Sequence, residues 1–361
     1  MAYTTINKSQ LHFDVLNYTG DGATSSAGTT ARTLTGLGFQ PSWVWVKEEN
    51  DTEQHFLQDA VRGVTKVLAS NVSGSESDCL TDFSSGGVNT FTSDGYTIGS
   101  GTGGNSNNIN TSGNGYRSYC WKGAGAGSSN TDGAITSTVS ANATAGFSIV
   151  RWDSNGGNNA TVGHGLGAEP KIIIYKAKNN NGAWYIWLNN IIENAQRNLN
   201  FSTAAKSNIN SGTYGSPSST TISNFGFGNT EQMIAYCFAE KKGYSKFGSY
   251  IGNGLADGSF VYTGFKPAFV TVKSYSTSVH NWCTMDIKND GFNPTNKQIH
   301  FNTSGVETLG SGTTIDILSN GFKMKTTDGD KNGNGTGYIY WAVAAEPLVA
   351  NVGQSIPATA R

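Results

Sequence analysis

Short apolar runs alternate with polar, glycine-rich stretches along the whole chain. Three of these runs share a pattern, in which a proline precedes aromatic and β-branched residues and a lysine follows six positions later. They lie at residues 39–47, 168–176 and 265–273. Aromatic and β-branched residues favour strands, and proline suits the first residue of a strand because it has no N–H to donate. The pattern therefore predicts one strand that occurs in three copies of the same unit.

Four further landmarks recur around this strand in a constant order. Each copy has an opening turn, a second strand with aromatic residues, a second turn with glycine, and a closing strand. The opening turns are at 18–22, 152–156 and 250–254; the second strands begin at His55, Trp184 and Trp282; the second turns are at 93–96, 224–227 and 319–322; the closing strands are at 116–121, 233–238 and 338–343. Asp-Gly and Asn-Gly pairs predict tight hairpins, because a type I′ turn needs positive φ at both central residues.

The spacing of the landmarks gives the size of a unit. From the proline to the matching closing-strand position is 79, 67 and 75 residues. A unit of about 100 residues has the size of one β-sandwich and is too long for a propeller blade. We therefore expect an all-β fold of three tandem, jelly-roll-like β-sandwich repeats. They are expected to be separate sandwiches, packed in a row or around an axis.

The expected domain boundaries follow from the same landmarks. The first repeat with its N-terminal segment covers 1–122, the second covers 147–242, and the third with a C-terminal tail covers 243–361. A Gly/Ser/Thr-rich linker is expected at 123–146, flexible unless it is docked. Short helical turns are expected at 59–67 and 191–198.

Composition agrees with a folded β protein of low charge. The 361 residues include 47 Gly, which lowers helix propensity, and 17 Phe, 15 Tyr and 8 Trp, which disordered chains lack. A net charge of −1 with 14% charged residues gives no electrostatic footprint for nucleic acid or for an anionic membrane. The N-terminus lacks the apolar run of a secretory signal, so we expect synthesis as a soluble protein in a cytoplasm.

The four cysteines are expected to be small buried hydrophobic residues. Cys79, Cys120, Cys237 and Cys283 form no CxxC pair and have no His at metal-ligand spacing. Cys120 and Cys237 also occupy the same position in two closing strands. Disulfides are the alternative.

The tryptophans of the first proline strand pose a choice between core packing and a sugar-binding platform. Trp43 and Trp45 share one face of the strand because side chains alternate. The second copy has Ile172 and Ile174 at these positions, and isoleucine offers no flat ring, so core packing is expected. A lysine stands six residues after each proline, and these lysines are expected to mark where each strand meets solvent. They are Lys47, Lys176 and Lys273.

Carbohydrate binding would use exposed rings in the loops, with Asn, Asp and Gly backbone groups for the hydroxyls. Tyr214 and Trp184 lie in Asn/Gly/Ser-rich segments and are the candidate rings. Such loops are also the default loop composition, so the ligand-binding residues stay unknown.

One loop imitates the start of a calcium site. Asp328, Asp330 and Asn332 provide oxygen ligands at the first, third and fifth positions, with Gly333 at the sixth. Ile339 stands where the bidentate Glu of such loops is found. A solvated hairpin loop is expected, with calcium as the alternative; no other cofactor or metal is expected.

Catalytic motifs are not evident. No strand has the paired carboxylates of a sandwich glycosidase, and no nucleophile elbow or phosphate-cradling loop occurs. His164 lies in a Gly-rich run and is expected to be an isolated loop residue. The set of five histidines is not expected to cluster, namely His12, His55, His164, His280 and His300. We therefore expect a protein that is not an enzyme.

Whole segments of the chain resemble a family of bacteriophage proteins, common in phages of marine bacteria and labelled virion structural or tail-fibre-like repeat proteins. The resemblance rests on residues 1–9, 36–47, 60–66, 127–133, 235–240, 244–254, 260–267 and 356–361. The chain departs from the family pattern at Ser42, where an Asp is common, and at 343–346, where a Phe is usual. The resemblance covers the chain end to end and implies no catalytic residue.

The resemblance implies a virion structural protein with concanavalin-like sandwich domains. We expect display on the virion surface, as a capsid decoration or a tail appendage or fibre, with a contribution to host-surface glycan attachment. The expected partners are other capsid or tail proteins, further copies of this chain, and a host cell-surface glycan, without nucleic acid or membrane insertion. The alternatives are a depolymerase-type enzyme that degrades glycans and a purely lectin-like glycan-binding module.

Overall fold

The structure, a computed structural model, describes residues 4–193, 195–208, 214–310 and 314–347. Strands dominate this part of the chain, and its helices include the 3-10 turn η1 (Ser9–Leu11) and the four-residue α2 (Gly329–Asn332). Neither is long or apolar enough to cross a membrane. The expected all-β class is confirmed. The tail at 356–361, one of the runs that carry the resemblance, lies outside the described residues.

Most strands of the described residues belong to three large antiparallel sheets with one strand order. The first sheet is β1 (Phe13–Thr19), β9 (Gly115–Trp121), β3 (Trp43–Glu48), β4 (Phe56–Asp59), β5 (Gly63–Leu68) and β6 (Ser77–Asp78). The second is β10 (Ser128–Asn130), β11 (Ser137–Asn142), β12 (Phe147–Asp153), β19 (Gln232–Phe238), β14 (Ile172–Ala177), β15 (Tyr185–Ile192), β16 (Ala195–Asn200) and β17 (Ser207–Asn208). The third is β20 (Ser245–Ile251), β28 (Gly337–Ala344), β22 (Pro267–Ser274), β23 (Cys283–Asp286), β24 (Lys297–His300) and β25 (Thr308–Leu309). In each sheet the closing strand lies between the opening strand and the proline strand.

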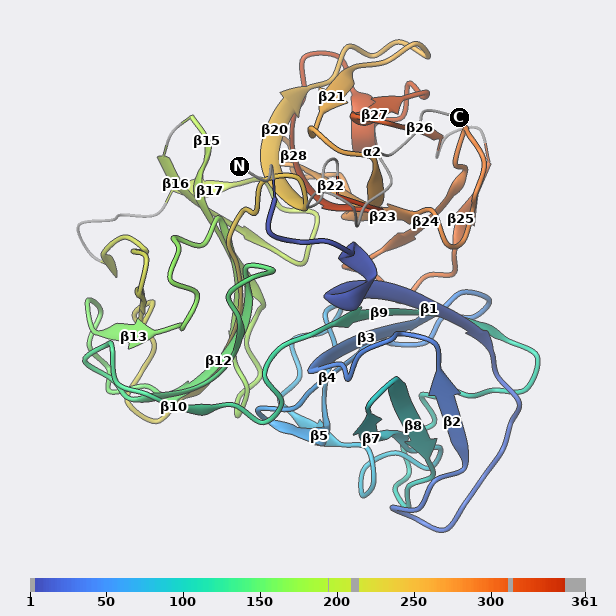
Figure 1. Cartoon of the computed structure of the whole chain (residues 1–361), viewed down its shortest axis with the longest axis vertical. Coiled ribbons are helices and arrows are strands. Elements are labelled where there is room, and N and C mark those ends of the chain that lie inside the picture. Colours follow the sequence, from blue (N-terminus) through green and yellow to red (C-terminus); the bar gives the residue numbers. More distant parts are fainter. Residues whose placement is uncertain (1–3, 194, 209–213, 311–313, 348–361) are drawn as a thin grey trace.

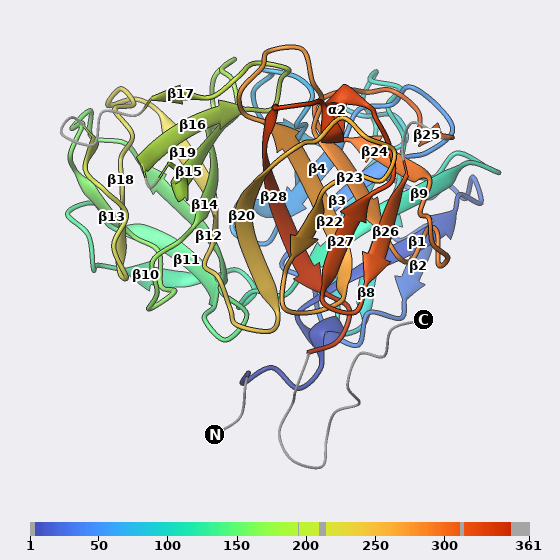
Figure 2. The ribbon, with the colours of Figure 1, turned by 90° about the horizontal axis from the view of Figure 1, so that it is seen from above.

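A smaller sheet packs on each large sheet. The small sheets are β2 (Arg32–Thr35), β8 (Gly95–Gly99) and β7 (Gly87–Thr92); β13 (Thr161–Gly163) and β18 (Thr221–Ser223); and β21 (Phe260–Tyr262), β27 (Gly321–Met324) and β26 (Ile315–Leu318). We call each large sheet with its small sheet a unit, numbered first to third along the chain. The units form the blue, green and orange-red lobes of Figure 1, and the perpendicular view shows β20 at the edge of the third unit that faces the second (Figure 2).

The large sheets enclose a hydrophobic core that all three units share. Trp43 and Trp45 point into this core, whereas Val44 and Val46 point into the separate core of the first unit. The Trp43 ring stacks on Tyr236 of the second unit, with centroids 4.1 Å apart. The predicted core placement of both tryptophans is confirmed. The expected separation of the sandwiches is wrong in this respect, because their inner faces bury one another.

Polar contacts close the three units into a ring. The first residue of each second-strand region bonds through a ring nitrogen to a backbone carbonyl of another unit. These contacts are Trp184 Nε1 to Ala69 O at 2.8 Å, Trp282 Nε1 to Asn200 O at 2.9 Å, and His55 Nε2 to His300 O at 3.1 Å. The second unit therefore donates to the first, the third to the second, and the first to the third. The units are arranged around an axis rather than in a row.

Two local expectations are wrong, and the expected linker is structured along part of its length. The segment 123–146 contains β10 and β11, which pair with one another and with β12, and its Ala124 N–H donates to Ser140 Oγ at 2.8 Å. Helical turns were expected at 59–67 and 191–198, but β5 occupies most of the first segment, and the end of β15 with the start of β16 occupies most of the second. In each case a neighbouring strand provides hydrogen-bond partners that the local sequence does not reveal.

The opening turns are not hairpins, although their glycines adopt the expected conformation. Gly22, Gly156 and Gly254 have φ of 68°, 77° and 67°. The Asp or Asn before each glycine does not have a positive φ, so the turns are not of type I′. The chain then crosses from a large sheet to a small one, instead of pairing the two flanking strands.

The comparison of the three units in sequence places the second turn of the second unit too far along the chain. Strand register pairs Leu34 with Tyr96, Val162 with Ile222, and Val261 with Phe322. Ile222, rather than Phe227, is therefore the counterpart of Tyr96 and Phe322. The turn 224–227 follows β18, and the small sheet of this unit has two strands in the described residues instead of three.

Candidate functional site

A pocket of about 320 Å3 opens in the second unit, beside its two-stranded small sheet. Its described lining is Tyr175, Tyr185, Trp187, Asn198, Ser207, Tyr214, Phe225, Gly226 and Phe227. This volume is at the lower end of the range for small-molecule sites, about 300–1,000 Å3. It suits a ligand with one or two rings.

The floor of the pocket is a cross-strand pair that only the second unit has. Tyr175 on β14 lies opposite Tyr185 on β15, and their rings stack with centroids 5.6 Å apart. At the same register the first unit has Val46 opposite Phe56. The third unit has Val272 opposite Cys283. Sequence comparison of the strands could have revealed this substitution of two tyrosines.

A strained turn forms one wall. Phe225 has φ of 58°, a left-handed conformation that is costly for a bulky residue, and its ring stacks on Tyr175 at 3.9 Å. Gly226 follows with φ of 74°, and a Cβ there would lie 2.6 Å from Tyr214 Cε1. The backbone of this turn therefore packs directly against the Tyr214 ring.

The described lining of the pocket contains no charged side chain. Its polar groups are the Asn198 amide, the Ser207 hydroxyl and the tyrosine hydroxyls. Burial raises the pKa of Tyr175, so this hydroxyl stays protonated. The pocket therefore presents rings and neutral hydrogen-bonding groups, which favour an uncharged ligand.

Of the two aromatic residues proposed from the sequence for sugar binding, only Tyr214 lies at the pocket. Tyr214 lines the pocket and is partly exposed. Trp184 is 2% exposed, lies in the shared core and bonds to Ala69 of the first unit. Its face is therefore not available to a ligand.

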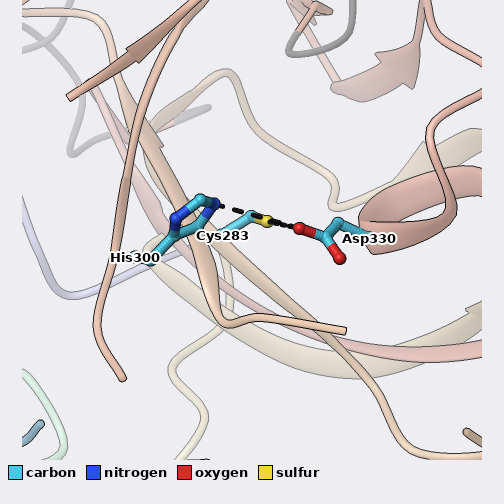
Figure 3. Close-up of side chains that lie close together, drawn as sticks. All are labelled: Cys283, His300 and Asp330. Carbon is cyan, nitrogen blue, oxygen red and sulfur yellow. Dashed lines mark hydrogen bonds and ion pairs between the residues drawn. The ribbon is translucent and has the colours of Figure 1, made fainter. Parts of the chain in front are cut away.

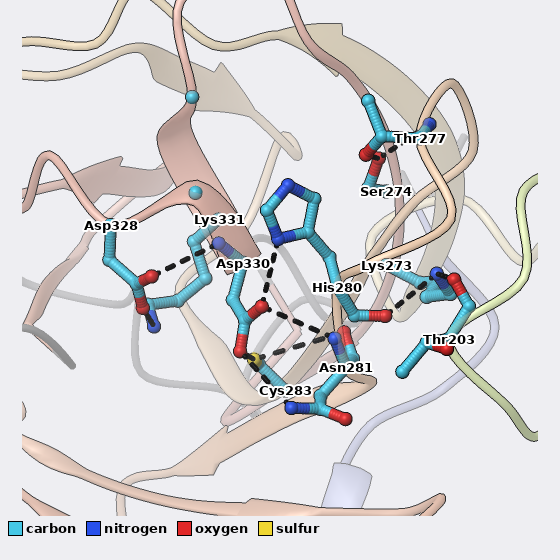
Figure 4. Close-up of polar contacts among 12 residues, drawn as sticks. Thr203, Lys273, Ser274, Thr277, His280, Asn281, Cys283, Asp328, Asp330 and Lys331 are labelled. Carbon is cyan, nitrogen blue, oxygen red and sulfur yellow. Dashed lines mark hydrogen bonds and ion pairs between the residues drawn. The ribbon is translucent and has the colours of Figure 1, made fainter.

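The lysines at the ends of the proline strands are buried, so the expectation that they meet solvent is wrong. Lys176 Nζ donates to Ser73 O of the first unit at 2.9 Å and also to Gly182 O. Lys273 Nζ donates to Thr203 O of the second unit at 3.1 Å (Figure 4). Burial lowers the pKa of Lys47, Lys176 and Lys273 to about 8. Lys176 and Lys273 are thus covered in part by the preceding unit, a contact that one copy of the sequence cannot show.

The loop expected to resemble a calcium site is not a hairpin. Asp328 caps α2 by accepting from Asp330 N, and its other oxygen accepts from Lys331 Nζ at 2.6 Å. Asn332 is buried, with its amide donating to Asn253 and to backbone carbonyls. The three candidate ligands are thus engaged with different partners, and calcium binding stays a prediction.

A second cluster of reactive side chains lies in the third unit. Ligand atoms of Cys283, His300 and Asp330 all lie within 4.8 Å of one another (Figure 3). His280 Nδ1 is 3.0 Å from Asp330 Oδ1 (Figure 4). The expectation that histidines do not cluster is therefore wrong for His280 and His300. They are 20 residues apart and meet only through Asp330, a pairing that no local motif signals.

The cluster is poorly suited to nucleophilic catalysis. Burial raises the pKa of the Cys283 thiol to about 12. Burial also lowers the pKa of His300. Burial alone would raise the pKa of Asp330, but bonds from His280 and Asn281 and the charges of Lys331 and His300 outweigh it and lower that pKa. A protonated thiol beside a carboxylate is not an activated nucleophile, whereas these groups are all metal donors.

Three pairs of a large and a small antiparallel sheet, with an aromatic pocket beside one small sheet, define this protein as an all-β protein with a candidate ligand-binding site. A family model described as Domain of unknown function (DUF7483) matches residues 8–347, and the chain belongs to this family. Searches of curated proteins and of solved structures found no match.

Proposed function

We propose that the protein is a structural component displayed on a bacteriophage particle, and that the pocket of the second unit binds a neutral sugar ring of the host surface. The observation that carries the binding part is the aromatic lining of this pocket. The resemblance of the sequence to phage virion proteins supports the particle part. Decoration of the capsid and a tail appendage or fibre both fit the proposal.

Sugar rings suit the pocket because they have both apolar faces and hydroxyl groups. The rings of Tyr185, Tyr214 and Phe227 are partly exposed, so a flat apolar face can pack against them. Asn198 and Ser207 lie at the same pocket and can bond to hydroxyls. The absence of charge from its described lining disfavours phosphorylated or carboxylated ligands.

The pocket gives no support to the alternative of a glycan-degrading enzyme. Glycosidases need two carboxyl groups about 5–10 Å apart at the bond they cleave. None of the described lining residues carries a carboxylate. A lectin-like module without a place on a particle remains the second candidate, since the pocket argument applies to it equally.

One pocket of this size is expected to bind a sugar weakly. A particle that displays many copies converts weak contacts into firm attachment, because later contacts are intramolecular.

Imaging and adsorption of particles test this function. Particles that lack the protein should lose density on the surface, and particles with Tyr214→Ala should keep the density but adsorb more slowly to host cells. Tyr262→Ala, which alters an exposed tyrosine of the third unit, is the matched control. Particles unchanged in appearance and composition after deletion would overturn the virion part. Sugar binding without a place on the particle would favour the lectin module.

A further inference from the structure

We infer that Cys283, His300 and Asp330 bind one transition-metal ion of the zinc type. The site lies in the third unit, shares no residue with the aromatic pocket, and is independent of the proposed sugar binding. Its ligands are a thiolate, an imidazole and a carboxylate, and a fourth position is left for water.

The donor atoms are already close to zinc geometry. Cys283 Sγ is 3.8 Å and His300 Nε2 is 3.9 Å from Asp330 Oδ2. Bonds of about 2.3 Å to sulfur and about 2.0–2.2 Å to nitrogen and oxygen give a tetrahedron with edges of roughly 3.3–3.6 Å. Side-chain shifts of a few tenths of an ångström therefore suffice for these two pairs.

The fold holds the donors in place. Cys283 on β23 and His300 on β24 are a directly opposed cross-strand pair, and Asp330 comes from the first turn of α2. The Asp330 carboxylate accepts from His280 at 3.0 Å and from Asn281 N at 3.3 Å. Such outer-shell bonds orient ligands in metal sites.

The hydrogen-bond network prepares the His300 nitrogen for a metal. Lys331 Nζ donates to Gln298 Oε1 at 2.9 Å, which fixes the amide, so Gln298 Nε2 must donate to His300 Nε2 at 3.1 Å. The His300 Nε2 atom is therefore unprotonated, and its lone pair accepts from the Gln298 amide. An unprotonated nitrogen is what a metal ligand must offer. A metal would take the place of the amide donor.

Charge and softness favour zinc over calcium. One thiolate and one carboxylate neutralise a divalent ion, which matters because Cys283 is fully buried. The nearby Lys331 ammonium bonds to Asp328 and Gln298 and not to the cluster. Sulfur and imidazole ligands select zinc-type ions, whereas calcium takes oxygen ligands.

Among the described residues, the first and second units lack the cysteine of this site. Strand register places Phe56 and Tyr185 at the position of Cys283 in the first and second units. The expected stoichiometry is therefore one ion per chain.

Metal content and cobalt spectroscopy of the full chain test the site. After incubation with Zn2+ and dialysis, wild type should retain one zinc per chain. Titration with Co2+ should give a sulfur-to-metal charge-transfer band and the strong visible bands of a tetrahedral site. Cys283→Ala should bind zinc more than about 100-fold more weakly, since even outer-shell changes cost about 10–100-fold. Cys237→Ala, which removes a buried cysteine of the second unit, is the control and should retain the ion.

The outcomes separate clearly. A wild-type chain that retains no zinc and gives no charge-transfer band would overturn the inference, whether or not Cys283→Ala folds. Retention of one zinc by folded Cys283→Ala would overturn it as well. If that variant does not fold, Asp330→Asn replaces it and should lose the ion.

Discussion

The Tyr236 hydroxyl of the second unit donates to Asp59 Oδ2 of the first unit at 2.8 Å. The equivalent residues form the same contact between the first and third units. There, the Tyr119 hydroxyl of the first unit donates to Asp286 Oδ2 of the third at 3.2 Å. Between the third and second units these positions are Trp341 and Leu188, both in the shared core. Two contacts of the ring thus have a buried carboxylate, and the third is apolar.

Removal of the Tyr236 hydroxyl should weaken the contact between the first and second units. Asp59 is fully buried beside Arg62, at 2.5 Å, so Tyr236→Phe deletes one donor to a buried charge. Hydrogen bonds to charged groups contribute about 1.5–3 kcal/mol, so the free energy of unfolding should fall by about 2 kcal/mol in denaturant titration. Tyr262→Phe on the surface should change it by less than about 0.5 kcal/mol. Equal values for the two variants would contradict a stabilising role.

His55 should make the protein sensitive to acid. Burial lowers the pKa of His55 to about 3, whereas an unfolded histidine titrates near 6.5. Between these values the unfolded chain binds a proton that the folded chain does not, so stability falls as pH decreases below about 6.5.

Replacement of His55 by the residue of the other units tests this effect. His55→Trp keeps a ring N–H donor, as in Trp184 and Trp282, and removes the titration. Thermal unfolding midpoints from pH 7.5 to 4.5 should fall less steeply for the variant than for wild type. Identical slopes would show that His55 does not contribute.

Lys176 should make the stability of the protein depend on pH in the alkaline range. Burial lowers the pKa of Lys176 to about 8, from an unfolded value near 10.5. The folded chain loses this proton first, so its stability rises with pH between about 8 and 10.5. Relative to Lys176→Met, wild type should gain up to about 1 kcal/mol per pH unit in this range, as measured by denaturant unfolding. A constant difference between the two proteins would place the amine in solvent.

The strained turn offers a test of the pocket shape. A Cβ at Gly226 would clash with Tyr214, so Gly226→Ala should displace this ring and weaken sugar binding by about tenfold. Gly228 does not have a left-handed φ, and a Cβ there would lie 3.6 Å from Glu231 Oε2, an ordinary van der Waals contact. Gly228→Ala should therefore bind as wild type does, and equal loss in both variants would argue against the role of Tyr214.

The sequence predicts the strand class well and the contacts between units poorly. Alternation along 43–46 places Trp43 and Trp45 on one apolar face, and comparison with Ile172 and Ile174 is enough to assign that face to a core. The burial of Lys176 could not be inferred, because its partner Ser73 belongs to another unit.

For the candidate sites too, local features could be predicted from the sequence, whereas contacts between distant segments could not. Tyr214 could be proposed from composition because it lies in a polar segment. Its neighbours Tyr175 and Tyr185 are strand residues, and they become part of a site only where the small sheet of the second unit is short. Cys283 and His300 meet through strand pairing, which sequence spacing alone does not specify.

The most direct measurement is binding of the purified chain to an array of neutral hexose, 6-deoxyhexose and N-acetylhexosamine oligosaccharides. The account predicts reproducible binding of wild type to at least one of these sugars. Tyr262→Ala should bind equally, and Tyr214→Ala should bind about tenfold more weakly, since it removes one ring of the pocket. Binding that is unaffected by Tyr214→Ala, or no binding of wild type to any neutral sugar, would contradict the proposal that this pocket recognises a glycan.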